Sequence, residues 1–99
     1  MVGEPDEIEV LELEFDDENL AHLARHGVTA DDVLSVLNAA PRFFRNLPGR
    51  GATHVMIGRV STHRFFYIAI VQTAPGCWRP ITGWPLTRAR AMNLFNRSD

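Results

Sequence analysis

The sequence feature that most constrains the fold is an apolar run at residues 65–71, Phe-Phe-Tyr-Ile-Ala-Ile-Val. A strand with one solvent-facing side alternates apolar and polar residues, whereas this run is apolar on both faces and is typical of a strand buried on both sides. Two further β-rich runs flank it, at residues 54–60 and 78–83, and short turn segments separate the three. We therefore predict an antiparallel sheet with residues 65–73 as its central strand.

A fourth strand is predicted at residues 8–15, where Leu11, Leu13 and Phe15 alternate with two glutamates. This alternation gives the strand one apolar face and one acidic face. The pattern shifts phase between residues 10 and 11, which indicates a bulge or an earlier start of the strand.

Two short helices follow the first strand. Asp16 or Asp17 can cap a helix over about residues 18–26, and Gly27 ends it. Thr29 caps the second helix, which extends to about residue 40, and Asp32 occupies the reciprocal position of a capping box.

The rest of the chain completes an α+β pattern. Residues 42–53 are predicted to be a loop, and a last helix begins at residue 86 or 87 and runs to residue 96. The order is β-α-α-β-β-β-α, which favours helices packed against one antiparallel sheet of about four strands.

Length and composition fit a small cytoplasmic domain. The 99 residues, 45% of them hydrophobic, predict one domain over residues 1–99, with residues 1–7 as a flexible lead-in. The single cysteine, Cys77, excludes an intramolecular disulfide, and no run approaches the ~20 apolar residues of a membrane span. The first residues lack the basic and apolar regions of a signal peptide, so we expect a cytoplasmic location.

Charge is divided unequally along the chain. Residues 1–20 contain nine acidic residues and no basic one, whereas residues 21–99 contain ten arginines against three aspartates, a net charge of +7. All ten cations are arginine, which either reflects arginine-rich codon usage or indicates phosphate binding. Such an asymmetry suggests an interaction with nucleic acid, although the overall pI of about 6.0 does not add support.

Three arginines near the C-terminus predict an anion site. Arg79 lies in the strand at residues 78–83, and Arg88 and Arg90 open the last helix. A guanidinium group carries a permanent charge and binds phosphate in a bidentate manner. We expect Arg88 and Arg90, together with Arg50 at the tip of the loop, to contact nucleic acid.

The candidates for proton transfer are His22, His26 and His54, because histidine titrates near neutral pH. The alternative for His26 is a favourable cation at the end of a helix, and the alternative for His22 is a helix surface. His22 and His26 have the i, i+4 spacing that can hold a metal ion, but the sequence supplies no glutamate between them and no third ligand. We expect no metal and no cofactor.

Four aromatic residues are available to stack on nucleic-acid bases: Phe66, Tyr67, Trp78 and Trp84. In a domain of this size such residues also serve as core. Cys77, in a turn, is interpreted as an incidental thiol rather than a nucleophile.

Five short motifs, in this order along the chain, together resemble a known family: Phe15-Asp16-Asp17-Glu18-Asn19, Arg25-His26-Gly27-Val28-Thr29, Ile57-Gly58-Arg59, Arg64 before an apolar strand, and Arg79-Pro80-Ile81-Thr82 before a helix that carries arginines. The set is similar to the BrnT-type toxins, the small RelE-like ribonuclease components of type II toxin–antitoxin systems. The resemblance covers about residues 11–96.

The resemblance implies a metal-independent endoribonuclease that cleaves mRNA, acts alone or with the ribosome, and forms oligomers through a small antitoxin. The family's basic positions fall on Arg25, Arg64 and Arg79, with His26 beside the first. Together with His54, these are the candidate catalytic residues. Cleavage through the 2′-hydroxyl needs a base, an acid and cations that stabilise charge on phosphorus, and we expect Arg64 and Arg79 to lie close together for the last of these roles.

The chain departs from the family after its last strand. The family's small–Arg–Arg–Ala–Thr segment is replaced by Gly83-Trp84-Pro85-Leu86-Thr87, an arginine stands where an acid is expected, and Phe95 is near the expected tyrosine. The alternative function is therefore a catalytically inactive relative that binds protein or nucleic acid.

Overall fold

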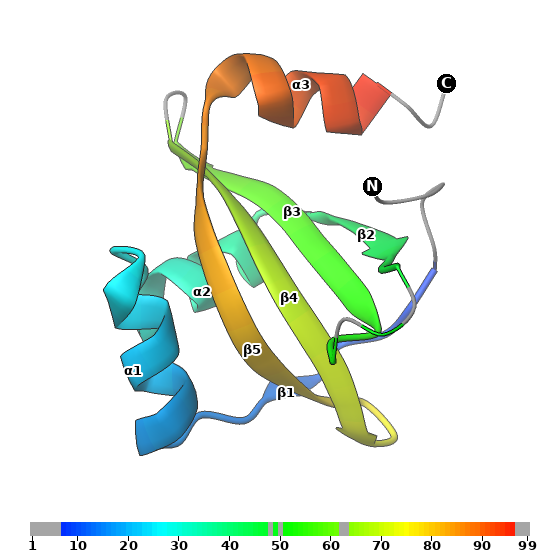
Figure 1. The fold of residues 1–99 in the computed structure, drawn as a ribbon. Helices are drawn as coiled ribbons and strands as arrows, with labels where there is room; N and C mark the ends of the chain where they lie inside the picture. Colours follow the sequence, from blue (N-terminus) through cyan, green and yellow to red (C-terminus); the bar gives the residue numbers. More distant parts are fainter. Residues whose placement is uncertain (1–6, 48, 50, 62–63, 97–99) are drawn as a thin grey trace.

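The computed structural model describes residues 7–47, 49, 51–61 and 64–96, and it confirms the α+β class (Figure 1). The elements along the chain are β1 (Glu12–Leu13), α1 (Asp17–Arg25), α2 (Ala30–Asn38), β2 (Arg42–Arg45), β3 (His54–Ser61), β4 (Arg64–Ala74), β5 (Cys77–Leu86) and α3 (Arg88–Asn96). One strand, β2, was not predicted.

The strands form a single sheet in the order β1-β5-β4-β3-β2. β2 to β5 pair antiparallel, and the position of β4 in the middle confirms the prediction from its apolar run. The prediction of about four strands, all antiparallel, was wrong in two respects. β1 runs parallel to β5, and a four-residue segment of the predicted loop pairs with β3 as an edge strand.

β1 has only two residues because the N-terminal segment changes phase. The amides of Leu11 and Glu12 both donate to the carbonyl oxygen of Gly76, at 2.8 and 3.0 Å, which interrupts the regular ladder. Leu11 is consequently 73% exposed, contrary to the expectation that it faces the core, whereas Leu13 and Phe15 pack against the core. The phase shift in the sequence therefore marks a real irregularity.

Both predicted helix starts are confirmed. Asp16 is the N-cap of α1, with Asn19 as its reciprocal partner, and Thr29 is the N-cap of α2, with Asp32 as its partner. Each pair satisfies two amides at the helix start that have no partner within the helix. Gly27 follows α1 with φ of 76°, a left-handed conformation that glycine adopts without strain.

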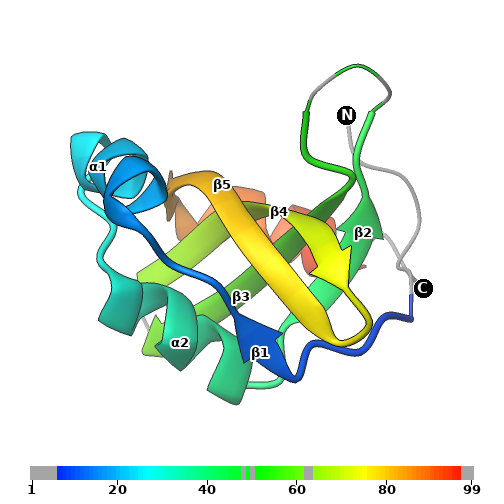
Figure 2. The same ribbon diagram turned by 90° about the horizontal axis from the view of Figure 1, so that it is seen from below.

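α1 and α2 cover one face of the sheet (Figures 1 and 2). Their buried residues pack with every second residue of the strands, a core made of Leu23, Val28, Val33, Val36, Met56, Phe66, Ile68, Ile70 and Trp78. A β-carbon added at Gly83 would lie 2.7 Å from Ile68 Cδ1 and 3.3 Å from Leu23 Cδ2. A glycine at this position therefore lets α1 pack closely on β5.

α3 packs on the opposite face, near the end of the sheet where β4 begins and β5 ends (Figure 1). Its Ala91 joins a second buried cluster that contains Phe44, Val55, Ile57, Phe65 and Leu86. Tyr67 and Trp84 lie at the border of this cluster and are only partly buried. The end of the sheet between α1 and α3 therefore carries accessible aromatic surface.

None of the helices in the described part of the chain has the length and hydropathy that crossing a membrane requires.

Candidate functional site

The candidate site is the end of the sheet where β4 begins and β5 ends. Phe65 pairs with Leu86 there, so Arg64 and the first residues of α3 are neighbours. His26, the C-cap of α1, reaches the same place through its contact with Trp84. We call this region the basic end, and its members are Arg25, His26, Arg59, Arg64, Arg88 and Arg90.

Arg64 is held in place without being buried. One of its terminal nitrogens lies 3.3 Å from a carboxylate oxygen of Asp32, and its guanidinium carbon lies 5.3 Å from the centre of the Phe66 ring. The side chain is still 55% exposed. Since the single contact with Asp32 leaves several donors of the guanidinium group facing solvent, Arg64 can also bind an anion.

Arg88 and Arg90 lie in the first turn of α3, which contains no acidic residue. Thr87 accepts a hydrogen bond of 3.2 Å from the amide of Arg90. The start of a helix carries partial positive charge, so two exposed arginines there are electrostatically unfavourable unless an anion is nearby. This arrangement favours the binding of phosphate groups.

A small cavity of about 130 Å³ opens at the basic end. Its lining consists of Gly27, Arg64, Phe65, Phe66, Pro85 and Leu86. The residues come from the turn after α1, the start of β4 and the end of β5, and Arg64 is the candidate cation among them.

The rings of Tyr67, Trp84 and His26 contact one another at the basic end. Trp84 stacks on Tyr67, with centroids 4.5 Å apart and an interplanar angle of 13°. His26 meets Trp84 edge to face at 6.1 Å. His26 is exposed and follows Arg25 at the last turn of α1, so both side chains are accessible at the basic end.

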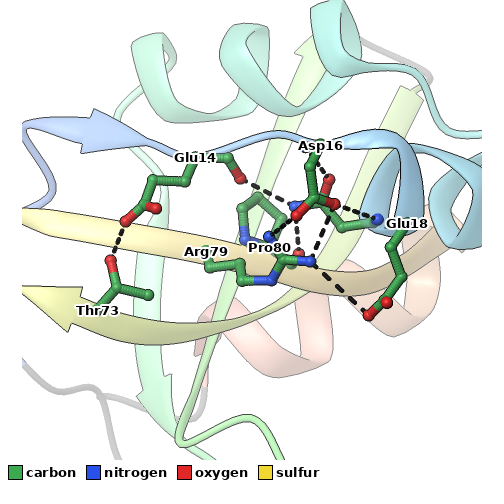
Figure 3. Close-up of polar contacts among 7 residues, drawn as sticks. Glu14, Asp16, Glu18, Thr73, Arg79 and Pro80 are labelled. Atoms are coloured by element: carbon green, nitrogen blue, oxygen red, sulfur yellow. Dashed lines mark hydrogen bonds and ion pairs between the residues drawn. The ribbon is translucent and has the colours of Figure 1, made fainter.

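Arg79, in contrast, is part of an internal ion pair (Figure 3). Its two terminal nitrogens donate to the two carboxylate oxygens of Asp16, at 2.5 and 3.0 Å, and Glu18 lies 3.9 Å away. The hydrogen bond from Arg79, supported by the amide of Asn19, lowers the pKa of Asp16 to about 2, and the same contact raises the pKa of Arg79. Arg79 therefore orients the start of α1.

Asn19 connects the same region to the sheet. Its side-chain nitrogen donates to the carbonyl oxygens of Glu14 and Pro80, both at 2.9 Å, and its side-chain oxygen accepts from the amide of Asp16 at 2.8 Å. The residue is only 2% exposed. Asn19 thus fixes the segment before α1, α1 itself and β5 to one another.

The expectation that Arg64 and Arg79 lie close together is wrong. Arg79 pairs with Val71, seven positions after Arg64 along β4. At about 3.3 Å per residue this separation is roughly 23 Å along the strand. Consecutive antiparallel strands start at opposite ends of a sheet, so two strand-starting arginines cannot share one phosphate group.

His54 does not reach the basic end either. It begins β3 opposite Ile70, is 8% exposed, and packs edge to face on Trp78 with centroids 5.1 Å apart. Thr53 lies within hydrogen-bond distance of its Nδ1, at 3.0 Å. His54 therefore forms part of the core at the far end of the sheet.

The other candidates are less informative. Arg50 lies outside the described residues. His22 is exposed on α1, and the described part of the chain holds no group of three metal-ligating side chains. Burial and the neighbouring Glu12 raise the pKa of the Cys77 thiol, the opposite of what activates a nucleophile.

No protein-family model, curated protein or solved structure matches this chain. Its function is therefore inferred from the chemistry of the site.

Two residues of the structure were not identified as important from the sequence. Asn19 is the last residue of the motif that begins at Phe15. The signal for its role is its position three residues after Asp16, which makes a capping box with asparagine in place of the usual glutamate or glutamine. Arg59 is exposed and pairs with Phe65 on β4, which adds a cation to the basic end. Its position becomes clear only once the strand register is known.

Replacing Asn19 with alanine removes three hydrogen bonds, two of them to carbonyl groups of neighbouring segments. We expect the free energy of unfolding to fall by about 2–4 kcal/mol, measured by urea denaturation. The control is Asn93→Ala, at an exposed position of α3. This substitution should change the free energy of unfolding by less than about 0.5 kcal/mol. Equal effects of the two substitutions would contradict this role for Asn19.

The low pKa of Asp16 predicts a pH-dependent contribution to stability. The carboxylate stabilises the fold fully above its ordinary pKa of 3.8, and this contribution disappears as the pH falls toward 2. Asp16→Asn retains a good N-cap but loses the charge. The stability difference between wild type and variant, measured by urea unfolding, should therefore shrink between pH 5 and pH 2. A difference that stays constant over this range would rule out the ion pair as its cause.

Proposed function

We propose that this protein is the toxin component of a type II toxin–antitoxin system, a RelE-like, metal-independent endoribonuclease that binds mRNA at its basic end. The observation that carries the proposal is the grouping of Arg25, His26 and Arg64 with two arginines at the start of α3 at one end of the sheet, where Arg64 lines a small cavity. The arginine pattern of the BrnT-type toxins first suggested this activity.

The distribution of charge supports an anionic ligand. Acidic residues of the N-terminal segment lie beside the start of β5, where Asp16 and Glu18 neutralise Arg79. The cations of the basic end lie at the other end of the same strands, with Asp32 as a local counterion of Arg64. A polyanion would therefore be attracted to one end of the molecule and repelled from the other, although the net charge is −2.

The chemistry assigned to this end is attack of the 2′-hydroxyl on the adjacent phosphorus, in which the P–O2′ bond forms as the P–O5′ bond breaks. The products are a 2′,3′-cyclic phosphate and a 5′-hydroxyl, whose oxygen takes its proton from water. His26, exposed beside Trp84, is the candidate base that removes the hydroxyl proton. Arg64 and Arg25 are the candidates that stabilise the charge developing on the phosphorus oxygens. Arg79 acts indirectly, by holding α1 in the position that brings His26 to Trp84.

A second function is favoured by the position of Arg79. Because Arg79 is paired with Asp16 and lies far from Arg64, the basic end lacks one of the cations that the resemblance implies. A protein with this arrangement can bind RNA without cleaving it. The alternative is therefore a catalytically inactive relative that binds nucleic acid or protein.

The proposed partners follow from the same surface. A small antitoxin would cover the basic end with acidic side chains and so exclude RNA, and oligomers would form through the antitoxin. The proposed location is the cytoplasm, where mRNA and ribosomes are present. Ribosome-bound mRNA is a substrate of the same chemistry.

Induced expression in bacteria and cleavage of a purified single-stranded RNA test the proposal. The wild type should arrest growth and cleave the RNA in the presence of a chelator, because the chemistry needs no metal. His26→Gln and Arg64→Gln should each reduce the cleavage rate by about 100-fold or more. Arg45→Gln, at the opposite end of β3 from the site, is the matched control and should cleave like the wild type.

A wild type that neither arrests growth nor cleaves RNA, but still binds it, would support the alternative. Cleavage at the wild-type rate by both His26→Gln and Arg64→Gln would contradict the assignment of the site.

A further inference from the structure

Tyr67 and Trp84 form a parallel aromatic pair on neighbouring strands. The two residues are directly opposite each other in the register of β4 and β5, so their side chains share one face of the sheet. Cross-strand aromatic pairs stabilise sheets, but in a closed core they are fully buried. Here both side chains remain partly exposed, at the border of the cluster under α3.

The contrast with the other aromatic residues supports a separate role for this pair. Phe66 and Trp78 are 2% and 3% exposed and belong to the core under α1 and α2. The Trp78 indole nitrogen also donates to the carbonyl oxygen of Glu9 at 2.9 Å. The aromatic residues that the sequence offered for base stacking are therefore divided, and only Tyr67 and Trp84 remain accessible.

The end of α1 brings basic residues to the pair. His26 touches Trp84, and Arg25 precedes it on α1. A ring that stacks on Trp84 would thus have positive charge within reach for the phosphate groups attached to it.

We propose that Trp84, supported by Tyr67, stacks on one unpaired base of RNA, so that the substrate class is single-stranded RNA. The inference rests on the proposed function and deepens it. Partly exposed aromatic rings on a sheet next to cations are the arrangement by which proteins bind single strands. In a duplex the bases stack on each other, so their faces are closed to Trp84.

The test uses a short single-stranded RNA that carries 2-aminopurine at one position and 2′-O-methyl groups throughout, so that it cannot be cleaved. Stacking of 2-aminopurine on Trp84 should quench its fluorescence on binding to wild-type protein. Trp84→Leu should abolish the quenching and weaken binding at least about fivefold, whereas Trp84→Phe, which keeps an aromatic face, should retain most of both. Arg45→Gln is the control, and thermal unfolding checks that each variant is folded.

The same RNA annealed to its complement should bind the wild type more weakly than the single strand. Equal affinity of the wild type for single-stranded and annealed RNA would overturn the inference. Binding of the single strand without quenching would overturn it as well. Both measurements use only the wild-type protein. Quenching without any cleavage of ordinary RNA would leave the stacking intact and contradict the toxin proposal. Cleavage that is unchanged in folded Trp84→Leu would contradict the stacking alone.

Discussion

The structure depends on the hydrogen bonds made by Asn19 at the start of α1. This side chain joins the segment before the helix to β5, and the adjacent pair of Asp16 and Arg79 fixes the first turn of the helix to the same strand. α1 has nine residues, so at about 1.5 Å per residue its last residue lies roughly 14 Å from its first turn, where these contacts are made. That length brings His26 to Trp84 at the other end of β5. The contacts of Asn19 and Arg79 and the candidate site therefore lie at opposite ends of the packed pair of α1 and β5.

Charge separation follows from this geometry. The acidic N-terminal segment is used locally, where it caps α1, binds Arg79 and, through Glu14, accepts a hydrogen bond from Thr73. It offsets arginine charge at the end of the molecule where β5 begins. The basic end is left with cations that have few acidic neighbours in the described part of the chain. A protein with a net charge close to zero can therefore have one acidic end and one basic end.

Much of the fold could be predicted from the sequence, because its signals are local. The cap of α2, the stop at Gly27 and the apolar run of β4 each depend on neighbouring residues, and each is confirmed. β2 could not be predicted, since four residues give too little alternation, and the parallel pairing of β1 depends on long-range contacts. The site was predicted less well. The arginines of the basic end other than Arg59 were identified. The separation of Arg64 from Arg79 follows from strand direction, and the burial of His54 against Trp78 depends on packing.

Binding of RNA by one end of the sheet, and not by the other, is the proposal on which the assigned chemistry depends. It can be tested by the change in amide chemical shifts on adding uncleavable single-stranded RNA to isotope-labelled protein, followed by NMR. We expect shifts at Arg25, Gly27 and Arg64 and at the indole group of Trp84, with Glu12, Glu14 and Arg79 unchanged. Shifts concentrated at the start of β5, with none at Trp84, would contradict the proposal.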